Sequence, residues 1–203
     1  MLYYNTVKPK TLELLINLQK LDLLSQSRLV GGTALALQFG HRESIDIGLF
    51  GNIIAKTDEI KNEFSKIGKT EIISASKNIN IFSVNDIKTD IVNYPFNWLF
   101  PEINEGNIIL ADIRDIAAMK LSAITNRGTK KDFIDLYYIL KQYTFNETLS
   151  FYEKKYKEAS PFLLLKSLVY FNDAEKEPMP KMTNKIDWEI IKSAIRKEVK
   201  KYT

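Results

Sequence analysis

Apolar residues recur along this chain at two different spacings, and the change from one to the other divides the sequence. Residues 9–25 repeat leucine and isoleucine at helical spacing, which predicts an amphipathic helix. Residues 28–30 are a short strand candidate that stops at Gly31-Gly32-Thr33, and residues 34–38 have the composition of a helix that ends at Gly40. The pattern therefore indicates a strand, a glycine turn and a helix.

Alternation of apolar and polar residues predicts a further strand over residues 44–50. After a predicted helix at residues 56–67, three extended segments follow near 69–75, 79–84 and 87–93, with Asn85-Asp86 as a hairpin turn. In the strand over 44–50, we expect one face to carry Ile45, Ile47 and Leu49, and the other to carry Ser44, Asp46 and Gly48.

From residue 112 onward the apolar spacing is helical throughout. It predicts helices over residues 112–126, 129–141, 145–157, 161–171 and 187–202. Residues 173–184, which include Pro178 and Pro180, form the longest predicted loop. We therefore expect an α+β (mixed α/β) fold, with a small mixed sheet and flanking helices in a domain over residues 1–105 and a helical domain over residues 106–203.

The composition is that of a globular protein, since 45% of the 203 residues are apolar and 27% are charged. No apolar run reaches about eighteen residues and the amino terminus lacks a signal-peptide pattern, so we expect a cytoplasmic protein with no membrane span. The chain has no cysteine and a single histidine, which excludes disulfides and two-histidine or thiolate metal sites. A bound metal would be Mg²⁺ or Mn²⁺ held by carboxylates. The net charge of +4 is compatible with an anionic partner such as nucleic acid or nucleotide.

Two features of the first half are candidates for chemistry. Gly31 and Gly32 lie between a strand and a helix, where backbone N–H groups can approach a phosphate, although a plain turn uses the same residues. Asp46 and Asp90 lie within predicted strands, where aspartate is disfavoured, and side by side in one sheet they would bind a hard cation. The alternative is that each aspartate ends a strand or pairs with a lysine.

Three charged residues of the second half are also candidates. Lys120 falls near the middle of the apolar stripe of its predicted helix, so its ammonium needs a carboxylate or a nucleotide phosphate, unless its stem reaches solvent at the helix edge. Asp132 follows Thr129 at the spacing of a capping box. Asp135 lies beyond that cap in a mostly apolar helix, so it either reaches a polar cleft or pairs with a basic neighbour such as Arg127.

The remaining basic positions have simpler interpretations. Arg42 could bind a phosphate or form a salt bridge with Glu43. His41 is predicted to be a surface loop residue. The basic tail is predicted to be a solvated helix face, with RNA contact as the alternative, and consists of Lys192, Arg196, Lys197, Lys200 and Lys201.

Taken in order, these residues resemble the AbiEii/AbiGii nucleotidyltransferase-like toxin family. The resemblance covers most of the chain. It rests on VGGTALAL at residues 30–37, on His41, Arg42, Ser44 and Asp46, on Asp90, on DIAAMKL at 115–121, on RGTKKDFIDLY at 127–137 and on YFNDAEKEPMP at 170–180.

The resemblance implies a DNA polymerase β-like nucleotidyltransferase fold whose helical half completes the nucleotide cleft. It implies transfer of a nucleotide from a nucleoside triphosphate to an acceptor, RNA such as tRNA, in toxin–antitoxin or phage-abortive systems, with an antitoxin protein as a possible partner. It assigns triphosphate binding to Gly31, Gly32 and Thr33 with Arg42 and Ser44, magnesium to Asp46 and Asp90, a phosphate to Lys120, and the acidic position of the helical half to Asp132 or Asp135.

The sequence departs from the family pattern at one position. The family has a second aspartate two residues after the first, and this chain has Gly48 there. Loss of a metal ligand should slow two-metal transfer by orders of magnitude. Two interpretations stay open: a weakened nucleotidyltransferase, or a non-catalytic module that keeps the fold and binds a nucleotide or another protein.

Overall fold

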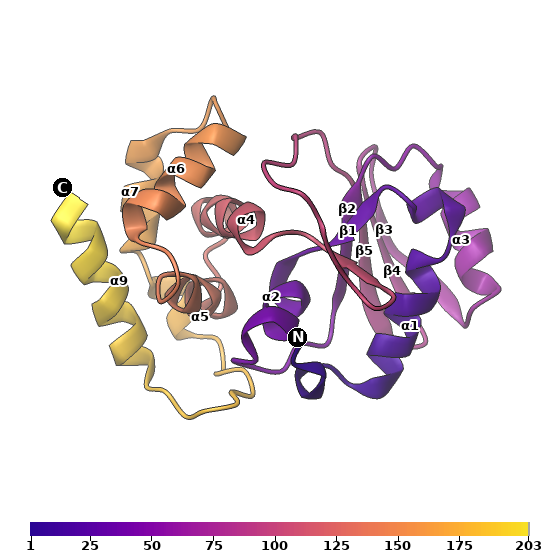
Figure 1. The fold of residues 1–203 in the computed structure, drawn as a ribbon, viewed down its shortest axis with the longest axis horizontal. Helices are drawn as coiled ribbons and strands as arrows, with labels where there is room; N and C mark the ends of the chain where they lie inside the picture. Colours follow the sequence, from indigo (N-terminus) through magenta and orange to yellow (C-terminus); the bar gives the residue numbers. More distant parts are fainter. Residues whose placement is uncertain (203) are drawn as a thin grey trace. The chain divides into compact units, whose positions relative to one another are not determined.

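The chain divides into two compact units, which are described here separately (Figure 1). The structure is a computed structural model that describes residues 1–202. The first unit comprises Met1–Gly40, Ser44–Phe96 and Pro101–Ala111, and the second comprises His41–Glu43, Asn97–Phe100 and the chain from Asp112. Two short segments therefore belong to the second unit although the residues on both sides of them belong to the first.

One mixed sheet forms the centre of the first unit, in the strand order β3-β4-β5-β2-β1-β7-β6. Strand β2 is parallel to β5 and β1 is parallel to β7, whereas the other neighbours are antiparallel. This arrangement confirms the α+β prediction. The strands are β1 (Ser27–Leu29), β2 (Ile47–Gly51), β3 (Thr70–Ala75), β4 (Ile79–Val84), β5 (Ile87–Asn93), β6 (Ile103–Glu105) and β7 (Ile108–Leu110).

Helices cover both faces of this sheet. Helices α1 (Pro9–Gln19) and α3 (Thr57–Ser65) lie on one face, and α2 (Gly31–Phe39) lies on the other (Figure 1). Phe64 of α3 packs edge-on against Phe82 of β4, with 5.2 Å between ring centres, and both are fully buried. Two 3-10 turns, η1 (Tyr4–Thr6) and η2 (Asp22–Leu24), complete the unit.

The second unit is helical. Its helices are α4 (Ile113–Asn126), α5 (Lys130–Ile139), α6 (Phe145–Lys155), α7 (Pro161–Leu168), α8 (Asn172–Glu175) and α9 (Trp188–Tyr202). Helix α4 packs against α5, α6 and α7, and α9 packs against α5 and α7. Phe133, Phe171 and Trp188 form an aromatic centre within the apolar core. Within residues 1–202, no helix has the length and apolar content needed to cross a membrane.

Most predicted elements are confirmed, because local patterns specify them. Asn85 and Asp86 form the turn between β4 and β5 with φ angles of 49° and 64°, the left-handed conformations that a two-residue hairpin turn requires. Strands β4 and β5 span the predicted residues, and α4 begins after the N-cap Asp112, whose side chain accepts a hydrogen bond from the Arg114 N–H.

Four details of the prediction are wrong. The helix predicted over residues 9–25 ends at Gln19, and η2 follows it. Strand β2 begins at Ile47, so Asp46 lies in the loop before the strand, and Ile45 is 51% exposed instead of facing the core. The pattern also missed β6 and β7, which are too short to show a period, and it missed α8 within the predicted loop at 173–184.

Candidate functional site

The residues predicted to form the site fall into two groups, one within each unit. The first group, in the first unit, consists of Gly31, Gly32, Thr33, Ser44, Asp46 and Asp90. The second group, in the second unit, consists of Arg42, Lys120, Asp132 and Asp135.

The amino terminus of α2 has no side-chain cap. Val30 is its N-cap residue, and an apolar side chain cannot accept a hydrogen bond from the first turn. Gly31 has a φ of +71°, a left-handed conformation that glycine adopts without steric cost, and a Cβ there would meet no other atom within 4 Å. The first turn therefore presents backbone N–H groups beside open space at the positive end of a helix, which favours an anion such as a phosphate.

The Thr33 hydroxyl connects α2 to the segment that carries Asp46. It donates a hydrogen bond to the backbone carbonyl of Asp46 and lies 2.8 Å from Ser44 Oγ. Both hydroxyl side chains are buried, and the Ser44 N–H donates to the Thr6 carbonyl at 2.9 Å. Thr33 and Ser44 therefore fix the backbone position of Asp46.

Gly48 and Asp90 are neighbours in register on the parallel strands β2 and β5. Because side chains alternate along a strand, both positions lie on the face opposite the fully buried Ile47. The Val30 N–H donates to the Gly48 carbonyl at 2.9 Å, which places the start of α2 beside Gly48. The Lys88 ammonium lies 2.9 Å from each oxygen of Asp90. The uncapped helix end and the Asp90 strand therefore lie on either side of Gly48.

The carboxylates of this group are suited to a magnesium ion that retains other ligands. Lys88 donates its hydrogen bond to Asp90 Oδ2, whereas Oδ1 is buried and, within residues 1–202, accepts none in good geometry. The same part of the chain contains no group of three histidine, aspartate or glutamate side chains that could hold a metal ion. Magnesium is commonly bound through one or two carboxylates together with waters and substrate phosphates. The buried Oδ1 of Asp90 has the chemistry of such a ligand, and Asp46 is the other carboxylate of this group.

Asp135 is the centre of a buried ion cluster in the second unit. Its Oδ1 accepts hydrogen bonds from His41 Nε2 at 2.8 Å and from Arg42 Nε at 2.7 Å. Its Oδ2 accepts from Arg42 Nη2 at 2.8 Å and lies 2.6 Å from Lys120 Nζ. Arg42 therefore binds this carboxylate with two parallel bonds, the strongest geometry of the pair.

Asp132 extends the cluster through Lys120. Its Oδ1 lies 2.9 Å from Lys120 Nζ, and its Oδ2 accepts from the Thr129 hydroxyl at 2.7 Å and from Arg127 Nε at 3.1 Å. Thr129 thus donates to the side chain of Asp132, whereas a capping box would have its hydroxyl accept from the backbone. With Arg42, the cluster contains three cations and two carboxylates.

Backbone hydrogen bonds hold residues 41–43 beside these helices. The Thr183 N–H donates to the His41 carbonyl at 3.0 Å, and the Glu43 N–H donates to the Lys181 carbonyl at 2.8 Å. The loop between α8 and α9 therefore pairs with this segment as a short antiparallel bridge.

The charges of the cluster decide its protonation states. Burial opposes ionisation of both carboxyls, but Arg42 and Lys120 outweigh it and hold the pKa of Asp135 well below its usual range. Burial also opposes the charge of Asp132, yet Lys120 and Arg127 lower its pKa to about 2. Burial lowers the pKa of His41, and the hydrogen bond to Asp135 offsets only part of that effect. At pH 7 the carboxylates are charged and His41 is neutral, with its proton on Nε2 facing Asp135.

The structure corrects several interpretations of single residues. His41, predicted to be a surface residue, is 2% exposed. Arg42 pairs with Asp135, whereas Arg127 pairs with Asp132. Lys192, predicted to be solvated, is 6% exposed and pairs with two glutamates. Asp135 follows Arg42 by 93 positions, so no local pattern signals their contact.

The sequence pattern also missed a second buried ion pair. Asp115 Oδ1 lies 2.7 Å from Lys155 Nζ, and both side chains are fully buried. Asp115 also accepts hydrogen bonds from the N–H groups of Leu99 and Phe100, each at 3.0 Å, and Lys155 donates to the Asn97 carbonyl at 2.9 Å. This pair therefore anchors residues 97–100 to α4 and α6.

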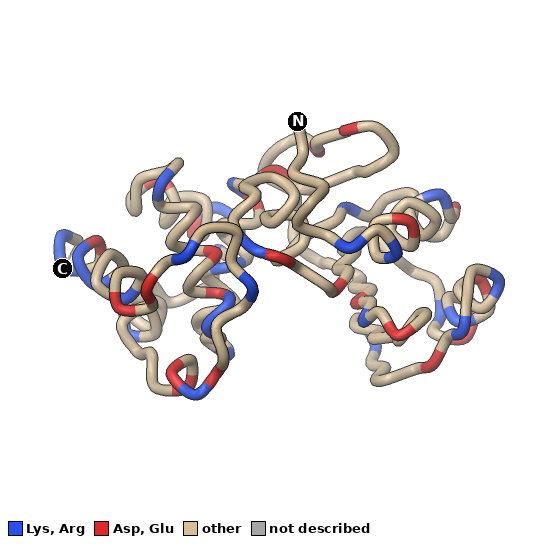
Figure 2. The backbone as a smooth tube through the Cα atoms, turned by 90° about the horizontal axis from the view of Figure 1, so that it is seen from below, with Lys and Arg blue, Asp and Glu red and all other residues tan. Residues whose placement is uncertain are grey.

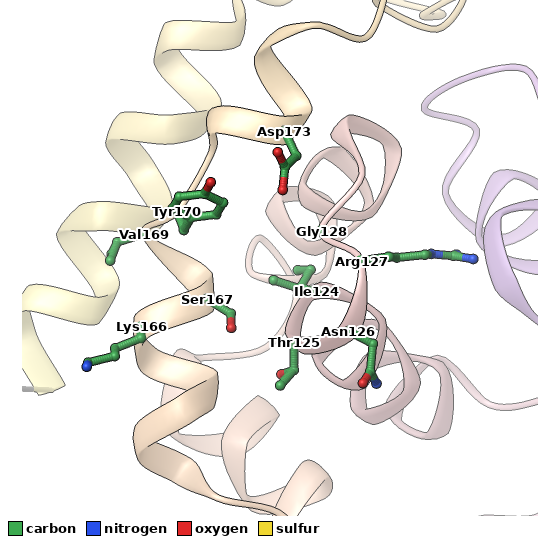
Figure 3. Close-up of a pocket in the computed structure, with 10 residues that line it drawn as sticks. All are labelled: Ile124, Thr125, Asn126, Arg127, Gly128, Lys166, Ser167, Val169, Tyr170 and Asp173. Carbon is green, nitrogen blue, oxygen red and sulfur yellow. The ribbon is translucent and has the colours of Figure 1, made fainter.

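A cavity of about 510 Å³ lies at the carboxyl ends of α4 and α7 (Figure 3). Figure 3 shows the Arg127 side chain extending away from Tyr170 and Asp173. The hydroxyls of Thr125 and Ser167 donate back to carbonyls of their own helices at 3.0 and 2.9 Å. These polar groups at the cavity wall are therefore already satisfied, and we assign the cavity no ligand.

The fold resembles that of two solved structures. A crystal structure of a putative nucleotidyltransferase from H. pylori matches with a TM-score of 0.54 and 18% identity, covering 97% of this chain and 99% of that chain. The structure of JHP933 from Helicobacter pylori matches with a TM-score of 0.53 and 18% identity, covering 97% and 96%. At this identity the likeness concerns the fold.

The family follows from sequence. The family model described as "Nucleotidyl transferase AbiEii toxin, Type IV TA system" matches residues 14–201. An uncharacterized protein of Aquifex aeolicus (strain VF5) is 32% identical over 202 residues, which are 97% of this chain and 97% of that protein. The chain belongs to the AbiEii nucleotidyltransferase toxin family, as the resemblance in its motifs predicted.

Proposed function

We propose that this protein is a magnesium-dependent nucleotidyltransferase that moves a nucleotide from a nucleoside triphosphate to an RNA acceptor such as tRNA. The observation that carries the proposal is the surroundings of Gly48. On one side lies the uncapped amino terminus of α2. On the other lies Asp90, whose buried Oδ1 accepts no hydrogen bond in good geometry within residues 1–202 and is held only by the Lys88 ammonium, 2.9 Å away. Membership of the family supports a nucleotide substrate.

In this proposal the N–H groups of Gly31 and Gly32 bind the triphosphate, and Asp46 and Asp90 hold the magnesium ion. The ion would neutralise triphosphate charge during transfer. Asp90 would exchange its ion pair with Lys88 for the metal. That exchange costs little because the two side chains are 30% and 44% exposed, and exposed pairs are weak.

The reaction joins an acceptor hydroxyl to the α-phosphorus. A new P–O bond forms as the bond to the β-phosphate oxygen breaks, pyrophosphate leaves, and the hydroxyl proton passes to solvent. The net charge of +4 is compatible with an anionic acceptor such as RNA. Thr33 and Ser44 contribute by holding the backbone of Asp46.

The buried ion cluster, in our proposal, stabilises the fold of the second unit. Each oxygen of Asp132 and Asp135 is within hydrogen-bonding or ion-pair distance of two donors of the chain. Neither carboxylate therefore has room for a metal ion. Lys120 would contact a phosphate only after its ammonium leaves these carboxylates, so we assign Lys120 and Asp135 a structural role within the second unit.

A second candidate is nucleotide binding without transfer. It is favoured by Gly48, which leaves two carboxylates where the family pattern has three. In either case the family description, a toxin of a type IV toxin–antitoxin system, supports an antitoxin as a partner. A role in abortive phage defence and a place in the cytoplasm are further parts of this proposal.

Calorimetric titration with each of the four ribonucleoside triphosphates, in magnesium and in EDTA, tests the proposed site. We expect saturable binding of at least one triphosphate in magnesium. Its affinity should be at least tenfold weaker in EDTA. Asp46→Asn should weaken it about tenfold, whereas Asp58→Asn, which changes an exposed carboxylate on α3, should not. If neither EDTA nor the Asp46→Asn substitution changes the affinity for the triphosphate, the nucleotide does not bind at this site.

Incorporation of a labelled nucleotide into tRNA separates the two candidate functions. Incorporation by the native chain supports the transferase. Magnesium-dependent binding without incorporation, together with incorporation by Gly48→Asp, would instead identify a nucleotide-binding protein that lost transfer at Gly48.

A further inference from the structure

An apolar groove of about 360 Å³ runs between α7 and α9 in the second unit. Phe162, Leu165 and Val169 line it from the α7 side, and Val199 lines it from α9. Phe162 is 66% exposed and Val169 is 43% exposed. Phe162, Leu165 and Val169 are three and four residues apart, and residues at this spacing lie on the same side of a helix.

Within residues 1–202, no segment covers this side of helix α7. Its sequence, PFLLLKSL, is apolar on nearly every face, a composition typical of helices that are buried all round. Leu164 and Leu168 are fully buried in the core, whereas Phe162, on the groove side, remains more than half exposed. An uncovered apolar helix face of this kind marks an interaction surface.

The rim of the groove is basic. Lys166, Arg196 and Lys200 line it, and its lining includes no carboxylate. Figure 2 shows closely spaced Lys and Arg positions towards the carboxyl end of the chain. Within residues 1–202 these three cations have no carboxylate within salt-bridge distance, whereas Lys201 on the same helix pairs with Glu198. Lys166 lies over the Phe162 ring, 4.5 Å from its centre.

We infer that this groove docks an acidic amphipathic helix of a partner protein. Apolar side chains at positions i, i+4 and i+7 of such a helix would cover Phe162, Leu165 and Val169, and flanking glutamates or aspartates would pair with the rim. Eight residues of α7 span about 12 Å, which matches about two turns of a partner helix. A nucleic acid would reach the rim but leave the apolar floor uncovered.

The probe is a fluorescein-labelled helical peptide with leucines at i, i+4 and i+7 and glutamates on the flanks, titrated with the full chain and followed by anisotropy. The control peptide has the same composition in scrambled order. Phe162→Ala is compared with Leu163→Ala, which changes an exposed residue of the same helix outside the groove. Lys200→Glu is compared with Lys197→Glu, which lies outside the groove on α9.

We expect saturable binding of the amphipathic peptide only. Phe162→Ala should weaken it about tenfold and Lys200→Glu about fivefold, with less than twofold change in each matched control. Equal binding of the scrambled peptide, or an unchanged affinity of Phe162→Ala, would overturn the inference. So would a labelled RNA that binds in place of the peptide and depends on Phe162, or sedimentation showing that the groove joins two copies of this chain.

Discussion

Gly48 and Asp90 lie side by side on the parallel strands β2 and β5, with their side-chain positions on the same face of the sheet. Nothing in the backbone requires glycine here, since the φ angle of Gly48 is not positive. A Cβ would make ordinary contacts of 3.6 to 3.7 Å with Val30 and Phe50. The sheet can therefore accept the second aspartate of the family pattern at this position.

Gly48→Asp should convert this strand pair into a stronger metal site. In EDTA the new carboxylate lies beside Asp90, and like charges on neighbouring strands should lower the free energy of unfolding by about 0.5–1 kcal/mol. Magnesium should remove that loss and raise the melting temperature of the variant more than that of the native chain. Thermal melts at several magnesium concentrations measure both effects.

Gly48→Asn is the matched control for this change. It has the same shape without the charge, so its melting temperature should not depend on magnesium more than that of the native chain. An equal magnesium response in Gly48→Asp and Gly48→Asn would show that Asp46 and Asp90 do not form a cation site.

Asp135→Asn should destabilise the second unit strongly. It removes the negative charge that both Arg42 and Lys120 face and leaves these two cations buried, and breaking a buried pair in this way costs about 3–5 kcal/mol. Urea unfolding measures the loss. Asp173→Asn, an exposed carboxylate on α8, should change the unfolding free energy by less than about 0.5 kcal/mol. If Asp135→Asn changes the free energy of unfolding as little as Asp173→Asn does, Asp135 does not stabilise the ion cluster as proposed.

His41 should titrate below pH 6.5, because burial lowers its pKa. It is the single histidine of the chain, so its ring protons can be followed by NMR without assignment of others. The unfolded chain takes up a proton near pH 6.5 while the folded His41 stays neutral, so the free energy of unfolding should fall as the pH drops below about 6.5.

The matched variant for this titration is His41→Gln, which keeps a donor for Asp135 and cannot titrate. Its stability should change less between pH 7.5 and 5.5 than that of the native chain. The carboxylates affect stability only at lower pH. The pKa of Asp132 is about 2, so its contribution to the free energy of unfolding is lost only as the pH falls from about 4 towards 2. A His41 signal that titrates above pH 6.5 would contradict its burial.

Lys155→Met should release residues 97–100. The variant leaves Asp115 without its buried cation and Asn97 without its donor, while the methionine fills much of the same space. The N–H groups of Leu99 and Phe100, which donate to Asp115, should exchange with solvent at least tenfold faster, and the amides of β4 should not. Lys154→Met, which changes an exposed neighbour, provides the control. Unchanged exchange at Leu99 would contradict the anchoring role of Lys155.

Local sequence patterns correctly predicted those elements that depend on residues close together in the chain. The hairpin at Asn85-Asp86 and the strands on either side of it were predictable because turn residues and alternation act over a few positions. Prediction failed at Asp46, where the strand begins one residue later, because pairing with β5 starts only at Ile47. It failed at β6 and β7 because three residues are too few to show a period.

The residues of the candidate site also divide into those that a local pattern predicts and those that depend on contacts between distant segments. Lys120 was recognisable as a charge inside an apolar stripe, and its carboxylate partners lie on the helix that follows. His41 gave no such signal, since its partner Asp135 follows it by 94 positions. Lys155 and Asp115 were missed for the same reason, with 40 positions between them.

The sequence by itself determined the order of helices and strands, the set of candidate carboxylates and the family, because each depends on residue type and short spacing. Only the tertiary structure decided how those charges are used. It placed Asp46 before its strand and occupied both oxygens of Asp135 with His41, Arg42 and Lys120. The reason is that a buried charge takes its partner from whichever segments the fold brings within about 3 Å, however far apart they are in the chain.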